Sequence, residues 1–171
     1  REDERKPYRA NSWRPVLMNE IFDKLREPFP ADAIHWRVGA TNNRDNPTKG
    51  IALAYLSAVD VMNRLDDVLG AENWQDRYPF SGCCELSIRI GGEWITKSNC
   101  AGETDVEKEK GQASTAFKRA AVKFGIGRYL YDMNNAWFDV EKRGRTTVFT
   151  KAAQQRMTDL YARWITKKVA A

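Results

Sequence analysis

The chain of 171 residues is 42% hydrophobic and has six tryptophans, which excludes a disordered protein and indicates one domain with its own core. No apolar run is long enough to cross a membrane and no signal-peptide pattern opens the chain, so we expect no membrane association and a cytoplasmic location. The net charge is only +5, but the residues from Lys118 onward include 12 basic and 4 acidic side chains, against 16 and 19 before it. This asymmetry favours an anionic ligand, with nucleic acid as the first candidate.

The first part of the chain predicts a polar lead-in followed by a helix and a strand. Residues 1–14 are expected to form a flexible lead-in, and residues 15–171 the single domain. Apolar periodicity predicts a helix over Pro15–Arg26, which ends before two prolines. Alternating residues predict a strand over Ala33–Ala40, followed by a polar loop at Thr41–Gly50.

A second, longer helix is predicted over Ile51–Leu69, ended by Gly70. It would be apolar on two sides, one made of Ala52, Tyr55, Leu56 and Val59 and the other of Ala54, Ala58, Val61, Leu65 and Val68. A helix with two apolar sides packs between a sheet and a further surface. In a domain of this size that surface is expected to be a neighbouring subunit.

An antiparallel meander is predicted next. Trp74–Phe80 is strand-like, with Pro79 placing it at an edge, and Cys84–Ile90 alternates as a half-buried strand. Gly91 and Gly92 suit a two-residue hairpin turn that leads into a strand over Trp94–Ala101.

The segment Thr115–Tyr131 predicts a helix with a core face, a cationic face and a glycine-rich end. Its core face consists of Ala113, Phe117, Ala120, Ala121 and Phe124. Lys118 and Arg119 point away from that face, and Gly125 and Gly127 let the chain turn before Arg128. A cationic surface beside such a turn suits a polyanion.

The remainder of the chain predicts a hairpin and a last helix. Trp137–Val140 and Thr146–Phe149 flank the basic tip Lys142–Arg145. Thr150 is expected to cap a helix that buries Ala153, Met157, Leu160, Tyr161 and Trp164.

The cysteines and the single histidine give little support to catalysis or metal binding. Cys83, Cys84 and Cys100 are odd in number and lack a Cys-x-x-Cys spacing, so we expect small buried thiols in a reducing compartment. His35 stands alone, which removes most zinc sites and histidine-based catalytic arrangements, and a structural role is expected for it.

Two segments in the right order resemble the Rad fifty-two family of single-strand annealing proteins. Phe117-Lys118-Arg119-Ala120 followed by Phe124-Gly125 resembles that family's Leu-Lys-Arg-Ala...Phe-Gly signature. Upstream, Tyr55 followed by Val59, Met62, Leu69-Gly70 and Trp74 is similar to its Tyr...Val-Ile...Phe-Gly...Trp run. The continuation from Gly127 to Tyr131 looks closer to the phage branch, the Sak-type annealing proteins. The resemblance covers about Pro15 to Asp132.

The resemblance implies an α+β fold, an antiparallel β-meander with flanking helices, in subunits that assemble into rings or spirals. It also implies a protein that is not an enzyme, that needs no ATP, cofactor or metal, and that pairs complementary strands of single-stranded DNA. The implied partners are single-stranded DNA, the annealed duplex intermediate, further copies of the chain and a single-strand-binding protein. For a phage protein, the location would be the cytoplasm of the bacterial host.

The family's motifs assign backbone contacts to Lys118, Arg119 and Tyr55, and Arg37, in an Arg-x-Gly setting, matches another such residue. Where eukaryotic members have a further arginine this chain has Val122, and Lys123 lies about 100° further around the helix. On charge and position alone, Lys123, Arg128, Lys49 and Arg143 complete the predicted DNA-binding set. Annealing requires base edges to stay free, so phosphate contacts should dominate over stacking, and many subunits must present the strand together.

Two alternative functions remain open from the residues. A metal-dependent nuclease would use carboxylates such as Asp76, Glu85 and Glu93, although the sequence offers no third ligand at a convincing spacing. An adaptor that binds duplex RNA would use the same basic residues to recognise shape.

Overall fold

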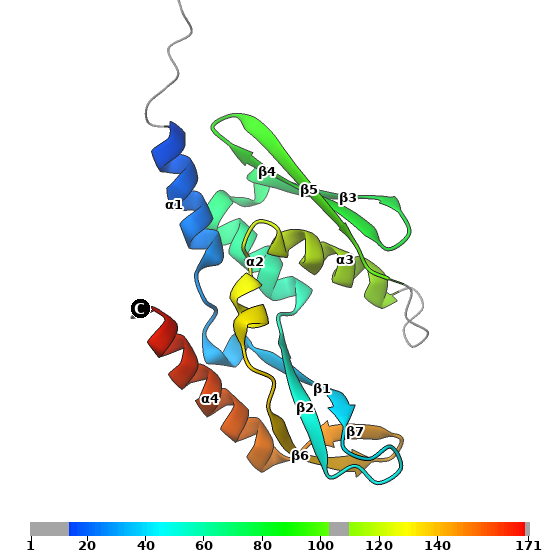
Figure 1. The fold of residues 1–171 in the computed structure, drawn as a ribbon. Coiled ribbons are helices and arrows are strands. Elements are labelled where there is room, and N and C mark those ends of the chain that lie inside the picture. Colours follow the sequence, from blue (N-terminus) through cyan, green and yellow to red (C-terminus); the bar gives the residue numbers. More distant parts are fainter. Residues whose placement is uncertain (1–13, 103–109, 170–171) are drawn as a thin grey trace, which may run out of the picture.

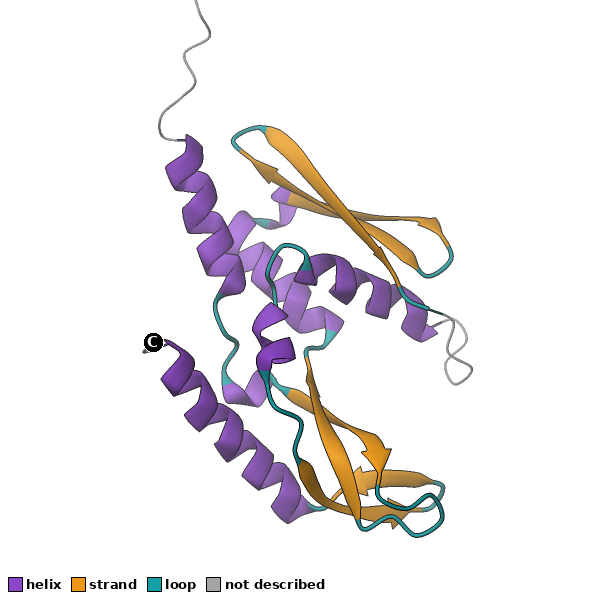
Figure 2. Ribbon diagram, viewed as in Figure 1, coloured by secondary structure: helices purple, strands orange, loops and turns teal. Residues whose placement is uncertain are grey.

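The computed structural model describes residues 14–102 and 110–169, which form two layers of secondary structure between which the chain crosses three times (Figure 1). The predicted lead-in lies outside the described residues except for Arg14, where the first helix begins. The upper layer contains a sheet and three helices, and the lower layer contains a second sheet and the last helix (Figure 2). The predicted α+β class with antiparallel sheets is confirmed.

The upper layer is the predicted meander covered by helices. Its sheet has the order β3-β4-β5, formed by β3 (Trp74–Phe80), β4 (Cys83–Ile90) and β5 (Glu93–Cys100). The helices are α1 (Arg14–Arg26), α2 (Ala58–Leu69) and α3 (Lys110–Val122). As predicted, β3 is an edge strand, and Gly91 and Gly92 both adopt positive φ in the tight turn between β4 and β5.

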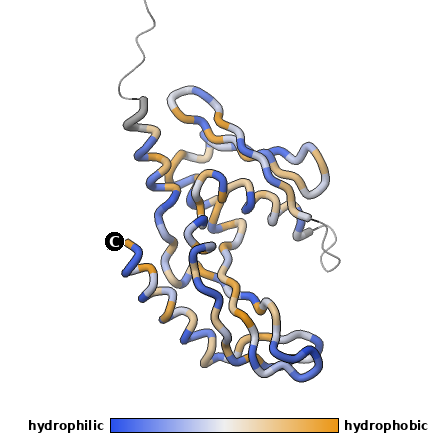
Figure 3. The backbone as a smooth tube through the Cα atoms, in the orientation of Figure 1, coloured by the Kyte–Doolittle hydropathy of each residue, from blue (hydrophilic) through white to orange (hydrophobic). Residues whose placement is uncertain are grey.

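The lower layer is a four-stranded antiparallel sheet with the order β1-β2-β6-β7. It consists of β1 (His35–Thr41), β2 (Lys49–Tyr55), β6 (Trp137–Arg143) and β7 (Thr146–Phe149), and α4 (Lys151–Val169) runs beside it. The predicted C-terminal hairpin is confirmed, and it adds to the N-terminal hairpin through the pairing of β6 with β2. The loop ends of this sheet are strongly hydrophilic (Figure 3).

The predicted helix over Ile51–Leu69 is wrong in its first third, because β2 occupies residues 49–55. The segment is a strand because it pairs with β1 on one side and with β6 on the other. It fits closely between them, since a Cβ at Gly50 would lie 2.7 Å from Val38 Cγ1 and 3.1 Å from Val140 Cγ1. The helix starts only after Ser57, whose hydroxyl accepts a hydrogen bond from Asp60 N while the Asp60 carboxylate accepts one from Ser57 N. This capping box is a sequence signal that the apolar pattern concealed.

The two apolar sides predicted for this helix are also wrong, so they no longer support a subunit interface there. Val61 and Leu65 are 2% and 0% exposed in the chain's own core, and Ala54, Ala58 and Val68 pack against the same core. Of the residues assigned to the other apolar side, Leu56 is buried, and Val59 is 57% exposed. The prediction of two apolar sides applied the helical period to residues 51–69 as a whole, although this range contains a strand followed by a helix.

Three hydrogen bonds tie the two layers together. Tyr129 accepts a hydrogen bond from Phe29 N at 2.8 Å, the hydroxyls of Tyr129 and Tyr161 are 2.9 Å apart, and the Tyr161 hydroxyl donates to Phe29 O at 2.6 Å. The three residues come from the segment after α1, from the short helix η3 (Arg128–Asp132) and from α4. Burial raises the pKa of both tyrosines, so these hydroxyls stay protonated and able to donate.

Two smaller expectations about helix faces need correction. Ala113 is exposed, so the buried face of α3 consists of Ala116, Phe117, Ala120 and Ala121, continued by Phe124. In α4, Thr150 accepts the predicted capping hydrogen bond from Ala153 N at 3.2 Å, but Leu160 is 43% exposed because it lies beside the stripe of Ala153, Met157 and Tyr161.

Candidate nucleic-acid interface

The outer face of the β1–β2 hairpin presents an aromatic ring and a cation side by side. Residues directly opposite each other in an antiparallel pair share one face of the sheet. His35 is opposite Tyr55, and Arg37 is opposite Leu53. His35, Arg37 and Tyr55 therefore project to the same side, whereas Ala52 is buried in the core on the other side.

Helix α3 brings the predicted lysine to this face. Lys118 Nζ lies 5.1 Å from the centroid of the Tyr55 ring, a cation–π distance. Burial and the positive charge of nearby Arg37 lower the pKa of Lys118. The negative charge of Asp60 raises this pKa but only partly offsets the decrease. We call Arg37, Tyr55 and Lys118 the Lys118 cluster. Three of the predicted DNA-binding residues, up to 81 positions apart in the sequence, thus meet at one place.

Asp60 borders the Lys118 cluster, and its carboxylate already has hydrogen-bond partners. Asp60 Oδ2 accepts hydrogen bonds from Ser57 N at 2.9 Å and from the Ser57 hydroxyl at 2.5 Å, and His35 Nε2 is 3.4 Å away. Burial raises the pKa of Asp60, but the hydrogen bonds from Ser57 and the neighbouring His35 outweigh it, so the pKa lies below its usual 3.8. The carboxylate is therefore ionised at neutral pH and is directed toward the helix cap.

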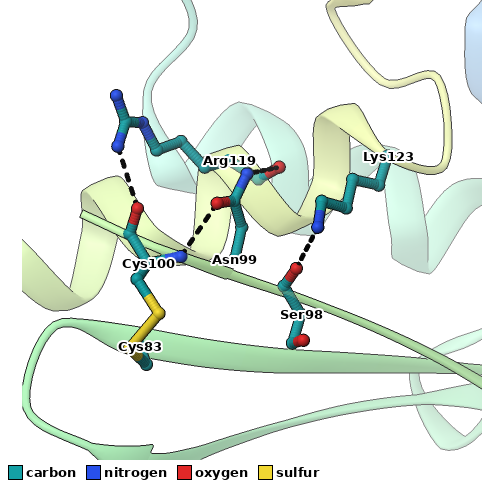
Figure 4. Close-up of a disulfide and its surroundings, with 6 residues drawn as sticks. All are labelled: Cys83, Ser98, Asn99, Cys100, Arg119 and Lys123. Carbon is teal, nitrogen blue, oxygen red and sulfur yellow. Dashed lines mark hydrogen bonds between the residues drawn. A yellow bond between two sulfur atoms is a disulfide. The ribbon is translucent and has the colours of Figure 1, made fainter. Parts of the chain in front are cut away.

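Arg119 and Lys123 project toward β5 instead (Figure 4). The Arg119 guanidinium donates to Cys100 O at 2.8 Å, and Lys123 Nζ donates to Ser98 O. Both side chains are exposed, and both satisfy backbone carbonyl groups at the end of the meander. They form a cationic border that is separate from the Lys118 cluster, because the two partners of the Lys-Arg motif point in different directions around the helix.

The same region corrects the expectation for the cysteines. Cys83 and Cys100 are directly opposite each other in the β4–β5 pair and form a disulfide (Figure 4). Only Cys84 is the buried free thiol that the sequence predicted. The pairing of residues 17 positions apart removes the cysteine argument for a reducing compartment.

Arg128 caps the C-terminal end of α3. Its guanidinium donates to Val122 O and to Lys123 O, both at 2.8 Å, where unpaired helix carbonyls carry partial negative charge. Lys97, which was not among the predicted site residues, donates to Lys123 O at 2.8 Å and lies 4.7 Å from the Phe124 ring. Burial lowers the pKa of Lys97, as do Arg128, Arg26 and Lys123. This placement depends on how β5 packs against the end of α3, which the local sequence does not encode.

The remaining two predicted contacts, Lys49 and Arg143, lie elsewhere. Lys49 is six residues from Tyr55 along β2, roughly 20 Å at the usual rise of a strand. Its ammonium is 2.6 Å from Asp139, and Arg143 binds Glu141 at 2.8 Å. Their role in DNA binding remains a prediction, and each already has an anionic partner.

The carboxylates considered for a nuclease do not converge. Glu93 on β5 is opposite Ile90 on β4. Ile90 is five residues from Glu85, so the two glutamates are separated by about 16 Å along the strand direction. Asp76 accepts a hydrogen bond from the Tyr78 hydroxyl at 2.7 Å. Within the described ranges no three His, Cys, Asp or Glu side chains group together as metal ligands, and no helix there could span a membrane.

Comparison with known proteins agrees with the family resemblance that the sequence motifs indicated. The family model described as Rad52/22 family double-strand break repair protein matches residues 18–87 and 81–149. The chain is also similar to the single-stranded DNA-binding protein DdrA of Deinococcus radiodurans, with 33% identity over 129 residues, 72% of this chain and 61% of that protein. DdrA of Deinococcus deserti is 33% identical over 128 residues, 71% of this chain and 62% of its own. The chain thus spans less than two thirds of these relatives, and the finer likeness to the phage branch stays a prediction.

Proposed function

Because this chain belongs to the Rad52/22 family of double-strand break repair proteins, we propose that it binds single-stranded DNA through the sugar–phosphate backbone and anneals complementary strands. The two relatives are named as single-stranded DNA-binding proteins, which supports the same ligand here. The reaction needs no nucleotide hydrolysis, since pairing two complementary strands is itself favourable once they are aligned.

The Lys118 cluster is the observation that carries this proposal. It combines two cations from different elements with an aromatic ring on an open sheet face. Neither Lys118 nor Arg37 has an anionic side chain within salt-bridge distance in the described part of the chain, in contrast to Lys49 and Arg143. Phosphate would supply that partner, and contacts of this kind bind DNA without regard to sequence.

Self-association is part of the proposal. Annealing needs a long strand held in register, and one domain of this size contacts only a few nucleotides. Several large apolar side chains are exposed in the described residues, with Phe80 and Tyr131 each 74% exposed and Trp137 50%. Exposed aromatic residues of this kind are enriched in protein interfaces, so we place subunit contacts there in preference to the core face of α2.

A strand-pairing assay tests the proposal. Two complementary labelled oligonucleotides are mixed with the protein in EDTA and without nucleotide, and duplex formation is followed by energy transfer at several salt concentrations. We expect faster pairing than without protein, together with tighter binding to single strands than to duplex DNA or duplex RNA. Preferred binding to duplex RNA, or cleavage on adding Mg²⁺, would replace the proposal by one of the alternatives.

A further inference from the structure

We propose that His35 is an additional phosphate-binding residue of this interface, and that its protonated form strengthens the binding of single-stranded DNA near neutral pH. The inference rests on the proposed function, because it assumes that DNA lies along the Lys118 cluster. It assigns a ligand-binding role to a residue for which the sequence predicted a structural one.

The strand register places His35 in the row of proposed DNA contacts. Since side chains alternate between the faces of a strand, His35 and Arg37 project to the same side of β1, about 7 Å apart along the strand. The imidazole ring lies 5.4 Å from the Tyr55 ring, and Lys118 is over that same tyrosine. The histidine side chain is 46% exposed, so a phosphate can reach it.

The charges around the imidazole make its protonation matter to an anion. Asp60 on α2 is the nearest charged group, Lys118 on α3 and Arg37 on β1 are positive, and the neighbouring Tyr55 on β2 is neutral. The walls that β7 and α4 contribute to the adjacent pocket of about 620 Å³ are Thr147, Val148, Phe149, Gln154 and Thr158, none of them charged. With a neutral imidazole, Arg37, Lys118 and Asp60 sum to one positive charge. Protonation of His35 doubles it.

Phosphate binding and protonation should therefore favour each other. Lys118 and Arg37 oppose a third positive charge, Asp60 favours it, and a phosphate placed among them adds a further negative charge. Histidine is the side chain that ordinarily changes charge between pH 5 and 8. Because a bound phosphate favours the charged imidazole, linkage requires tighter binding at pH 6.0 than at pH 7.5.

The test uses the fact that the chain contains a single histidine. Anisotropy of a fluorescent oligo(dT) measures affinity of the wild-type chain and of His35→Gln at pH 6.0 and pH 7.5, with fixed salt. We expect the wild type to bind several-fold more tightly at pH 6.0 than at pH 7.5, and the variant to lose that difference. A wild type that binds equally at both pH values overturns the inference but leaves the proposed function intact.

A second measurement needs no variant. The one imidazole Cε1–H resonance of the wild-type chain is followed by NMR against pH, with and without oligo(dT). DNA should move the midpoint of the titration to higher pH. An unchanged midpoint in the presence of bound DNA means that His35 serves only to hold Asp60, which overturns the inference. Failure to bind DNA at either pH removes the proposed function and the inference with it.

Discussion

Replacing Lys118 by methionine tests whether the Lys118 cluster is built for a ligand or for stability. The methionine keeps an unbranched apolar stem against Tyr55 but removes the charge. A charge-assisted contact to phosphate is worth about 1.5–3 kcal/mol, so affinity for oligo(dT) should fall roughly 10- to 100-fold. The dependence of log affinity on log salt should flatten by about 0.7, the value for one phosphate contact on a single strand.

Folding should respond very differently to the same change. Lys118 is partly desolvated and lies near Arg37, and both effects lower its pKa, so the charged lysine is held at a cost. Its cation–π contact with Tyr55 returns about 0.5–1 kcal/mol. These effects oppose each other, and the free energy of unfolding in urea should change by less than about 1 kcal/mol.

The matched control is Lys167→Met, an exposed lysine near the C-terminal end of α4. It should leave both the affinity and the salt dependence within about twofold of the wild type, as expected for a charge that touches no phosphate. Two results would refute the reasoning: Lys118→Met binding with unchanged affinity and salt slope, or the control variant losing as much affinity. A large loss of stability in Lys118→Met would make the lysine a structural residue.

Three further changes probe the scaffold. Tyr161→Phe removes the buried hydroxyl that donates to Phe29 O and should cost about 1–3 kcal/mol of unfolding free energy in urea; a loss below 0.5 kcal/mol, on the order of a surface change, would contradict a linking role. Replacing Cys83 and Cys100 by serine should lower the free energy of unfolding by up to about 3 kcal/mol, the value expected for a closed loop of this length. Mass spectrometry of the wild type without reductant should give a mass two hydrogens below that of the reduced chain. Asp60→Ala should lower the free energy of unfolding by about 1 kcal/mol at pH 7, because it removes the helix cap. The pKa of Asp60 in the folded protein lies below its usual 3.8, so the difference between wild type and variant should shrink as the pH falls below about 4. An effect that does not depend on pH would refute the capping role.

The local patterns of the sequence predicted most elements because their signals are short-range. The β4–β5 hairpin was readable from strict alternation and two glycines, and the cap of α4 from a threonine before an apolar stripe. The one large error, at residues 51–55, came from a segment of small and apolar residues that fits a helix and a central strand equally well. Pairing of β2 with both β1 and β6 decided it, and those partners are distant in sequence.

For the interface, the sequence by itself determined the kind of chemistry: a cationic helix, a tyrosine at the family's spacing and an arginine on the first strand indicate a polyanionic ligand. Only the tertiary structure decided which cations stand together. It gathered Arg37, Tyr55 and Lys118, turned Arg119 toward the end of β5, assigned Arg128 to a helix end, and placed His35 beside the cluster. The physical reason is that charge and residue type are properties of a position in the chain, whereas direction depends on strand register and on the rotation of a helix against a sheet, both of which are fixed by contacts between distant residues.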